Sequence, residues 1–487
     1  MEEEMYRTNT MRMRDRVLYC RAFLRLAGKT QIYSTNFTDH TRSRMTHSIE
    51  VAQIARTIGT GYNSAQNDKQ DKKIDVNLVE AIALAHDLGH TPYGHAGERQ
   101  LHAILNYQDE RINRKLFGDN IVDRLFEKGD SLRNLFCSNR GFKHNLQSAR
   151  IIKMLSSEYQ NGDMYPEGTF SECDDFIEGV IHHTKVSYND NDGELSYYGS
   201  CFSKELIEKD SYSVITYIIR KSDEIAQLHH DIEDAISFRY ISTDQAVNLI
   251  FSDGENLPKD FLDNKKELDT IRSEKFFLRK ISHIILKYLV SKYVDILIEG
   301  TIFESGTSEY DKVCKHIQRN IQNIILLSQD VKRMDARGSF VIRKLFEAYA
   351  QDPLQMPNGK LNSVFREFLY QYSKKIGLEE SIKERILNIL SNDKSIYVFE
   401  NACDCRKYFS DCHKMKENNT ICMSLDENNV SLINDSPTEE GLFIKIEYFE
   451  FRISLMRVIA DYIAGMTDSY AEKEYQKLYG VVHEIVH

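Results

Sequence analysis

Helix breakers are scarce in this chain, and their scarcity limits the folds open to it more than any other feature. Only 6 prolines and 23 glycines occur among the 487 residues, so few positions interrupt a helix. Apolar residues meanwhile recur at helical intervals, as at Val51, Ile54, Ala55 and Ile58. The sequence predicts an all-α protein, with helices over residues 17–26, 46–58, 79–86, 214–236, 276–298, 317–327, 341–350, 382–390 and 443–486, and loops over 61–73 and 188–198.

The composition narrows the class of protein. The 63 Lys and Arg residues against 74 Asp and Glu residues give a net charge of −11, so nucleic-acid binding is not indicated, although nothing forbids it. At 41% hydrophobic residues the chain can bury a large core. No apolar run of about 18 residues occurs, and the N-terminal segment Met1–Glu4 is acidic. We therefore expect a globular, cytoplasmic protein that neither spans a membrane nor carries a secretory signal.

Nine cysteines are spread thinly over the chain, an odd number that does not suggest a disulfide framework. A Cys-rich insertion at residues 401–437 holds four of them: Cys403, Cys405, Cys412 and Cys422. Their spacing fits a zinc site poorly, because C-x-C is tighter than the usual C-x2-C pair. We expect free thiols in an irregular segment, and a small structural zinc site is the alternative.

Two places on the predicted helices gather polar groups. Four Gly or Pro residues follow His86-Asp87 between positions 89 and 97, which places this dipeptide at a helix C-terminus beside a loop. On the helix over 214–236, three carboxylates and one amide fall on a single face, at Asp223, Gln227, Asp231 and Asp234. Carboxylates aligned in this way indicate a functional role.

Four side chains from three separated helices are candidate metal ligands, namely His47, His86, Asp87 and Asp223. Two imidazoles and two carboxylates form a mixed nitrogen and oxygen set that suits Mn, Fe, Zn, Ni or Mg. A divalent ion held there would acidify a bound water or polarise a phosphoryl oxygen, which is hydrolytic chemistry. Each histidine taken alone is more often an ordinary core or surface residue, so the residues by themselves leave both interpretations open.

The sequences around these residues resemble a known family. The chain contains, in order, RDR at 14–16, FLRLAGKTQIY at 23–33, RSRMTHSIEV at 42–51, HDLGHTPYGHAGE at 86–98, GFKHNLQS at 141–148, DEIAQLHHDIED at 223–234 and DYIAGMTD at 461–468. This series resembles the HD-domain metallophosphohydrolases, and within them the deoxyguanosine triphosphate triphosphohydrolase (dGTPase) family. The resemblance is weakest around residues 60–75, 185–215 and 395–440.

The resemblance implies an all-α HD-domain fold with additional C-terminal helices. It also implies that His47, His86, Asp87 and Asp223 hold one divalent metal ion, with Asp87 facing the attacking water. The residues leave the identity of the ion open among Mn, Mg, Fe, Ni and Zn.

Further catalytic roles follow from the same resemblance. His95 resembles the family's catalytic histidine, Glu98 the carboxylate that orients it, and His144 another active-site histidine near the phosphates. A histidine oriented by a carboxylate can protonate a leaving oxygen or assist the attacking water. The structural alternatives are a loop histidine bonded to backbone for His95 and a helix N-terminal charge for Glu98. We expect His90 to be structural or to support the ligands.

Substrate contacts are implied in the same way. Arg44 resembles the family's phosphate-binding arginine, and Gln31 and Asp231 resemble residues that contact the 3′-hydroxyl of the sugar. Arg42 could add positive charge, but an exposed role explains it equally well. Gln227 stands where the family often has a tyrosine that packs on the sugar and excludes a 2′-hydroxyl, so the discrimination of deoxyribose from ribose is in question.

The reaction implied is hydrolysis of a dNTP to deoxynucleoside and inorganic triphosphate, by attack of water on the α-phosphorus. Residues 1–240 would form the catalytic core, and residues 241–487 a helical region for oligomerisation and regulation. Family members are oligomers, often hexamers built from dimers, so a homo-oligomer with a dNTP effector is implied. Two alternatives stay open: another HD-type phosphohydrolase acting on monophosphates or cyclic nucleotides, and a dNTP-sensing regulator with little turnover.

Overall fold

The chain folds into two compact units, each built from separate stretches of sequence. The computed structural model describes residues 7–31, 42–66, 72–117, 141–155, 174–184, 202, 206, 213–252, 257–268, 271, 273–300, 308–373, 378–391, 402–414, 420–425, 430–433 and 443–480. Unit 1 comprises Met1–Leu88, Thr169–Lys185 and Asp210–Ala336, and unit 2 comprises Gly89–Gly168, Val186–Lys209 and Arg337–His487. The functional division expected at residue 240 stays a prediction.

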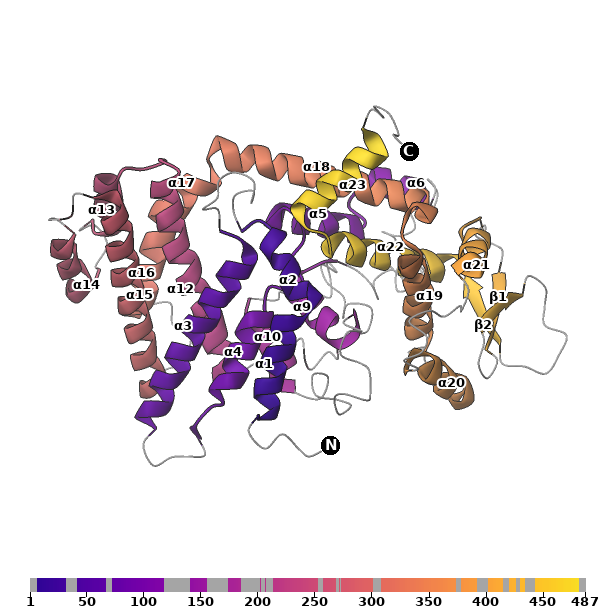
Figure 1. Ribbon diagram of the computed structural model, residues 1–487, viewed down its shortest axis with the longest axis horizontal. Coiled ribbons are helices and arrows are strands. Elements are labelled where there is room, and N and C mark those ends of the chain that lie inside the picture. The colour runs from indigo at the N-terminus through magenta and orange to yellow at the C-terminus, as the bar shows by residue number, and fades with distance from the viewer. Residues whose placement is uncertain are drawn as a thin grey trace, which may run out of the picture. The chain divides into compact units, whose positions relative to one another are not determined.

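Unit 1 is helical. Its helices are α1 (Asn9–Tyr19), α2 (Arg21–Arg25), α3 (Arg44–Ala65), α4 (Val76–Ala85), α10 (Asp174–His182), α12 (Val214–Ser237), α13 (Thr243–Ile250), α14 (Lys259–Asp263), α15 (Glu274–Glu299), α16 (Glu309–Ile317) and α17 (Asn323–Leu326), with short 3-10 or π turns at Leu26–Gly28, Asn264–Glu267 and Gln318–Gln322. Helices α3, α4, α12 and α15 lie side by side, with α3 in contact with the other three (Figure 1). This bundle positions the residues from which the sequence predicts a metal site.

Local capping explains where the key helices of unit 1 begin. Ser43 and Thr46 form a capping box at the start of α3, and the Asp75 carboxylate accepts hydrogen bonds from the first turn of α4. The Ser213 hydroxyl does the same for α12. Such caps satisfy the N–H groups that a helix start leaves unpaired. They fix which residue of each helix comes first, and so which side chains face the neighbouring helices.

Unit 2 is also mainly helical and carries a small sheet. Its helices are α5 (Gly94–Leu105), α6 (Glu110–Phe117), α9 (His144–Arg150), α19 (Asn358–Tyr372), α20 (Glu380–Ser391), α21 (Ala402–Lys414), α22 (Tyr448–Ala464) and α23 (Asp468–Tyr479), with turns at Ile151–Leu155 and Pro353–Gln355. Helix α18 (Gln329–Gln351) runs from the last residues of unit 1 into unit 2. Strands β1 (Thr420–Leu425), β2 (Val430–Ile433) and β3 (Phe443–Glu447) form an antiparallel sheet in the order β2-β1-β3, with Cys422 opposite Ile433 and Lys445.

The all-α prediction is confirmed at the level of fold class, but the prediction of an irregular segment at 401–437 is wrong. Within it the structure has helix α21 and strands β1 and β2, and β3 occupies the start of the segment predicted as helix from residue 443. Every second residue is buried there, Ile421 and Met423 on β1 and Ile444 and Ile446 on β3. Alternating burial is the pattern of a β-strand. It extends over only a few residues that lie among polar residues, so it is difficult to detect in the sequence.

Two helix boundaries also differ from the sequence-based expectation. The helix predicted over 17–26 is interrupted at Cys20, whose extended backbone ends α1 and whose Sγ accepts the Phe23 N–H at 3.3 Å to start α2. The loop predicted from residue 61 begins later, because α3 continues to Ala65. The loop predicted over 188–198 lies outside the described residues. Among the described helices, none has the length and apolar character that crossing a membrane requires.

Candidate functional site

Three helices of unit 1 bring the predicted metal ligands together. His47 lies in the first turn of α3, His86 and Asp87 directly follow α4, and Asp223 lies on α12. His47 Nε2 is 2.9 Å from Asp223 Oδ1. His86 Nε2 is 3.8 Å from the same oxygen and 3.5 Å from Asp87 Oδ1. The four side chains therefore form one group, buried except for Asp223, which is 26% exposed.

The spacing and orientation of this group suit a divalent ion. Ligand atoms about 2.1 Å from a metal lie about 3.0–3.4 Å from one another, close to the separations seen here. The His86 Nδ1 faces the Ala83 carbonyl oxygen at 2.6 Å, so Nε2 is the nitrogen directed at the carboxylates. Burial alone would raise the pKa of Asp223, but its hydrogen bond with His47 and the nearby His86 hold that pKa below its usual range.

His183, which sequence reasoning missed, belongs to the same group. Its ring centre lies 4.9 Å from that of His86, and ligand atoms of His86, His183 and Asp223 lie within 4.8 Å of one another. The His183 Nδ1 faces the Val180 carbonyl oxygen at 2.7 Å, so Nε2 is the nitrogen that would serve as a metal ligand. The dipeptide His182-His183 at the end of α10 is the signal that could have indicated it.

Arg44 lies buried against Asp87, one of the predicted metal ligands. Its Nη1 donates to Asp87 Oδ2 at 2.8 Å, and the side chain is 2% exposed. Its Nε and Nη2 have no hydrogen-bond partner within the described part of the chain. Buried donors left in this way are costly unless a ligand completes them, and a guanidinium suits a phosphate. The position and chemistry of Arg44 therefore agree with the phosphate-binding role that the resemblance implies.

Gln31, Gln227 and Asp231 form a hydrogen-bonded row. Gln31 Nε2 donates to Gln227 Oε1 at 3.1 Å, and Gln227 Nε2 donates to Asp231 Oδ1 at 2.6 Å. Gln31 Oε1 and Asp231 Oδ2 are buried and have no partner among the described residues. Burial raises the pKa of Asp231 to about 8. The structure thus brings together the three residues expected to contact the sugar.

A second row of polar residues lies behind His47. The His47 Nδ1 is 3.4 Å from the Nδ1 of His230, whose Nε2 hydrogen-bonds Glu50. Arg42 pairs with Glu233 at 2.9 Å and with Glu50 at 3.5 Å. The side chain of Arg42 is therefore already satisfied by carboxylates, which disfavours a phosphate-binding role for it.

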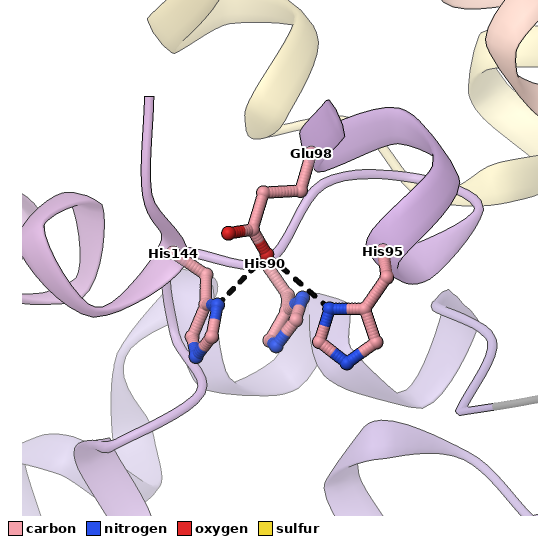
Figure 2. Close-up of side chains that lie close together, drawn as sticks. All are labelled: His90, His95, Glu98 and His144. Atoms are coloured by element: carbon pink, nitrogen blue, oxygen red, sulfur yellow. Dashed lines mark hydrogen bonds and ion pairs between the residues drawn. The ribbon is translucent and has the colours of Figure 1, made fainter. Parts of the chain in front are cut away.

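The predicted catalytic side chains of unit 2 form a group of their own (Figure 2). Glu98 Oε2 accepts hydrogen bonds from His144 Nδ1 at 2.8 Å and from His95 Nδ1 at 3.4 Å. His90 stacks on His144, with ring centres 3.9 Å apart and planes inclined by 14°. Burial would raise the pKa of Glu98, but the facing His144 and His95 hold it well below its usual range. Glu98 is therefore a buried carboxylate that orients two imidazoles, and the His95 side chain is 63% exposed.

We define the acid–base cluster as His90, His95, Glu98 and His144. Close packing explains two glycines of the motif at residues 86–98, which carries the first three of these residues. A Cβ on Gly89 would lie 2.3 Å from the His144 carbonyl oxygen, and a Cβ on Gly97 would lie 2.2 Å from that of Pro92. Neither position has room for a side chain. Gly89 therefore lets the chain pass against the start of α9, and Gly97 lets α5 begin tightly after the Pro92 turn.

The structure does not support the alternative of a zinc site in the Cys-rich insertion. No group of potential metal ligands within the described residues contains a cysteine. Cys405 and Cys412 are buried free thiols, and burial raises the pKa of both, to about 11 for Cys405. A zinc site requires thiolates. The side chains of Cys403 and Cys422 lie outside the described residues.

Comparison with known proteins gives matches of two kinds. The HD domain matches residues 44–188, and the phosphohydrolase-associated domain matches residues 445–477. Three relatives, each described as a deoxyguanosinetriphosphate triphosphohydrolase-like protein, are 28% identical to this chain. The protein of Wolinella succinogenes aligns over 77% of this chain and 94% of its own length. The corresponding shares are 75% and 80% for that of Clostridium tetani, and 72% and 79% for that of Allorhizobium ampelinum.

Proposed function

Because the chain belongs to the dGTPase-like family of HD-domain phosphohydrolases, we propose that it is a deoxynucleoside triphosphate triphosphohydrolase. Water oxygen bonds to the α-phosphorus, and the bond from that phosphorus to the 5′-oxygen breaks. The 5′-oxygen takes up a proton and leaves as deoxynucleoside, and the three phosphates leave together as inorganic triphosphate.

The observation that supports this proposal most directly is the hydrogen bonding of the Arg44 guanidinium. Its guanidinium is held by the candidate ligand Asp87, while two of its nitrogens lack partners among the described residues. A phosphate oxygen bound there would complete the hydrogen bonding of the guanidinium and lie next to the candidate metal ligands. His47, His86, Asp87 and Asp223 would hold a divalent ion, such as Mn, Mg, Fe, Ni or Zn, which neutralises phosphate charge and lowers the pKa of a bound water.

The row of Gln31, Gln227 and Asp231 would bind the sugar. Two oxygens that have no partner within the described part of the chain, Gln31 Oε1 and Asp231 Oδ2, lie at either end of the row. A sugar hydroxyl can donate to the first and bond with the second. The row therefore supports a nucleotide substrate rather than a bare phosphate compound.

The acid–base cluster would supply the proton. His95 is the exposed member, and Glu98 orients it through Nδ1. Its Nε2 can then protonate the departing 5′-oxygen, while Glu98 also holds His144 for a phosphate contact. The sequence motif that runs unbroken from His86 to Glu98 supports assigning both groups to one reaction. We extend the proposal to a homo-oligomer that responds to a dNTP effector, as the resemblance implies.

A product assay tests the proposal. The protein is incubated with Mn²⁺ or Mg²⁺ and each dNTP, alone and mixed, and nucleoside, mono-, di- and triphosphate products are separated. Deoxynucleoside and inorganic triphosphate in equal amounts are expected, with Asp87→Ala as the inactive control. Release of monophosphate or orthophosphate would instead identify another HD-type phosphohydrolase activity, and binding without turnover would identify a sensor.

A further inference from the structure

The motif at residues 461–468 belongs to the family-like series but has no chemistry assigned to it. It contains two buried aspartates, Asp461 near the end of α22 and Asp468 at the start of α23. We propose that these two carboxylates are positioning residues that fix helices α9 and α5, and through them the acid–base cluster. The inference rests on the catalytic role proposed for that cluster.

Asp461 holds α9, the helix that begins with His144. Its Oδ1 accepts from Gln147 Nε2 at 2.8 Å, and its Oδ2 accepts from Arg150 Nη2 at 2.8 Å. Arg150 Nε adds a contact of 3.2 Å to each oxygen. Gln147 and Arg150 lie three and six residues after His144, on one face of the helix. Both partners of the Arg150–Asp461 pair are almost fully buried. Arg150 Nη2 also pairs with the buried Glu367 carboxylate at 2.6 Å, so loss of Asp461 would leave this buried arginine with one of its two carboxylate partners.

Asp468 holds the start of α5, the helix that carries His95 and Glu98. Its Oδ1 accepts the backbone N–H of Tyr93 at 2.9 Å. Tyr93 is the N-cap residue of α5 and has left-handed backbone angles, φ 60° and ψ 25°. A non-glycine residue keeps this conformation only where its surroundings impose it. The Tyr93 hydroxyl, which lies 3.2 Å from Glu472 Oε2 on α23, adds a second attachment.

The two aspartates are joined by a short, well-capped turn. Helix α22 ends at Ala464 with Gly465 as its C-cap, and the Thr467 hydroxyl caps α23 by accepting the Tyr470 N–H at 3.3 Å. The turn thereby sets the distance between Asp461 and Asp468, and hence between the starts of α9 and α5. Glu98 can bond His144 and His95 at once only when both helices are in place, because a hydrogen bond is lost within a few tenths of an ångström beyond about 3.5 Å.

Turnover measurements test this inference. Asp468→Ala removes the acceptor of the Tyr93 N–H, and we expect kcat to fall roughly 10- to 100-fold, with KM within about 3-fold of the wild type. Asp468→Asn keeps an oxygen acceptor and should restore most of kcat. The matched control is Glu474→Ala, which removes the acceptor of the Tyr349 hydroxyl bond at 3.0 Å on the same helix and should leave kcat unchanged.

A double-mutant cycle separates positioning from general destabilisation. In a His95→Ala background, Asp468→Ala should lower kcat by less than about 3-fold, because the group that it positions is already absent. An equal loss in both backgrounds, or a loss with Glu474→Ala as large as with Asp468→Ala, would overturn the inference. If Asp468→Ala does not fold, Asp468→Ser, whose hydroxyl suits a helix start, takes its place in the cycle.

A readout independent of activity distinguishes failure of this inference from failure of the proposed function. The ¹⁵N chemical shifts of the histidine ring nitrogens report hydrogen bonding, and the signals can be assigned with His95→Gln and His144→Gln. Asp468→Ala should change the His95 signal, Asp461→Asn the His144 signal, and Glu474→Ala neither. These changes in a protein that turns over no dNTP would support the positioning and refute the proposed function. Unchanged shifts in an enzyme that turns over dNTPs would refute the positioning and support the proposed function.

Discussion

Asp231 allows the predicted sugar site to be tested through stability rather than turnover. The side chain is 1% exposed, its Oδ1 accepts from Gln227 at 2.6 Å, and burial raises its pKa to about 8. At pH 7 the carboxyl group is therefore protonated in the folded protein, whereas in the unfolded chain, with a pKa of 3.8, it is ionised. The folded state binds more protons than the unfolded state over this interval.

The sign and size of the effect follow from this difference. Stability falls as pH rises wherever the folded state binds more protons, so this group lowers stability progressively from about pH 4 to pH 8 and by a constant amount above that. Each pKa unit corresponds to about 1.4 kcal/mol. The interval from 3.8 to pH 7 therefore costs about 4 kcal/mol, and the full shift to about 8 costs about 6 kcal/mol.

Asp231→Asn should remove this cost, because the amide matches the protonated carboxyl group in shape and can still accept from Gln227. We expect the variant to be more stable than the wild type at pH 7, with a difference that grows by about 1.4 kcal/mol per pH unit between pH 5 and 8. Urea unfolding at pH 5, 6, 7 and 8, monitored for the transition of unit 1, measures it. A stability difference that does not change with pH would refute the reasoning.

Asp234→Asn serves as the control for substrate effects. Burial also raises the pKa of Asp234, to about 7, on the same helix. Its replacement should likewise give a pH-dependent gain in stability. It should leave the affinity for a dNTP unchanged, whereas Asp231→Asn should alter that affinity if Asp231 contacts the sugar.

Three further predictions concern the proposed reaction. Arg44→Lys keeps a positive charge but loses the donor fork beside Asp87, so we expect a loss of roughly 10- to 100-fold in kcat/KM, measured by triphosphate release. His95→Ala should leave dNTP binding intact, as followed by calorimetry, and lower kcat by roughly 10²- to 10⁴-fold; normal turnover would exclude it as the acid. His183→Ala should weaken Co²⁺ binding by roughly 10- to 100-fold in equilibrium dialysis, and unchanged affinity would show that it is not a ligand.

Long periodic segments made the helices of both units predictable, but short features did not show in the sequence. The predicted helix over 214–236 is α12 almost to the residue, because 24 residues keep one apolar face. The break at Cys20 depends on a single extended residue, and the strands near 420–447 have only a few alternating positions. In both places local hydrogen bonds and strand pairing determine the structure. The periodicity of apolar residues does not reveal either of them.

Candidate site residues could be selected from the sequence because the local motif of each is distinctive, whereas their pairings could not. Nothing in the sequence states that Glu98 bonds His144, which is 46 residues away, or that Asp461 bonds Arg150, 311 residues away. His183 lacks a motif beyond the preceding histidine, so only its place beside His86 indicates a metal-site role. Such contacts arise from packing between helices that are distant in sequence.

Gln227 shows how a departure seen in the sequence gains meaning from its neighbours. As an isolated difference it suggested only weaker exclusion of a 2′-hydroxyl. In the structure its amide accepts from Gln31 with one end and donates to Asp231 with the other. A tyrosine hydroxyl can also accept and donate, but it does both through one oxygen, whereas the Gln227 amide uses two separate atoms. Gln227 therefore organises the two groups proposed to contact the 3′-hydroxyl, and discrimination against ribose would have to come from side chains other than a stacked ring at this position.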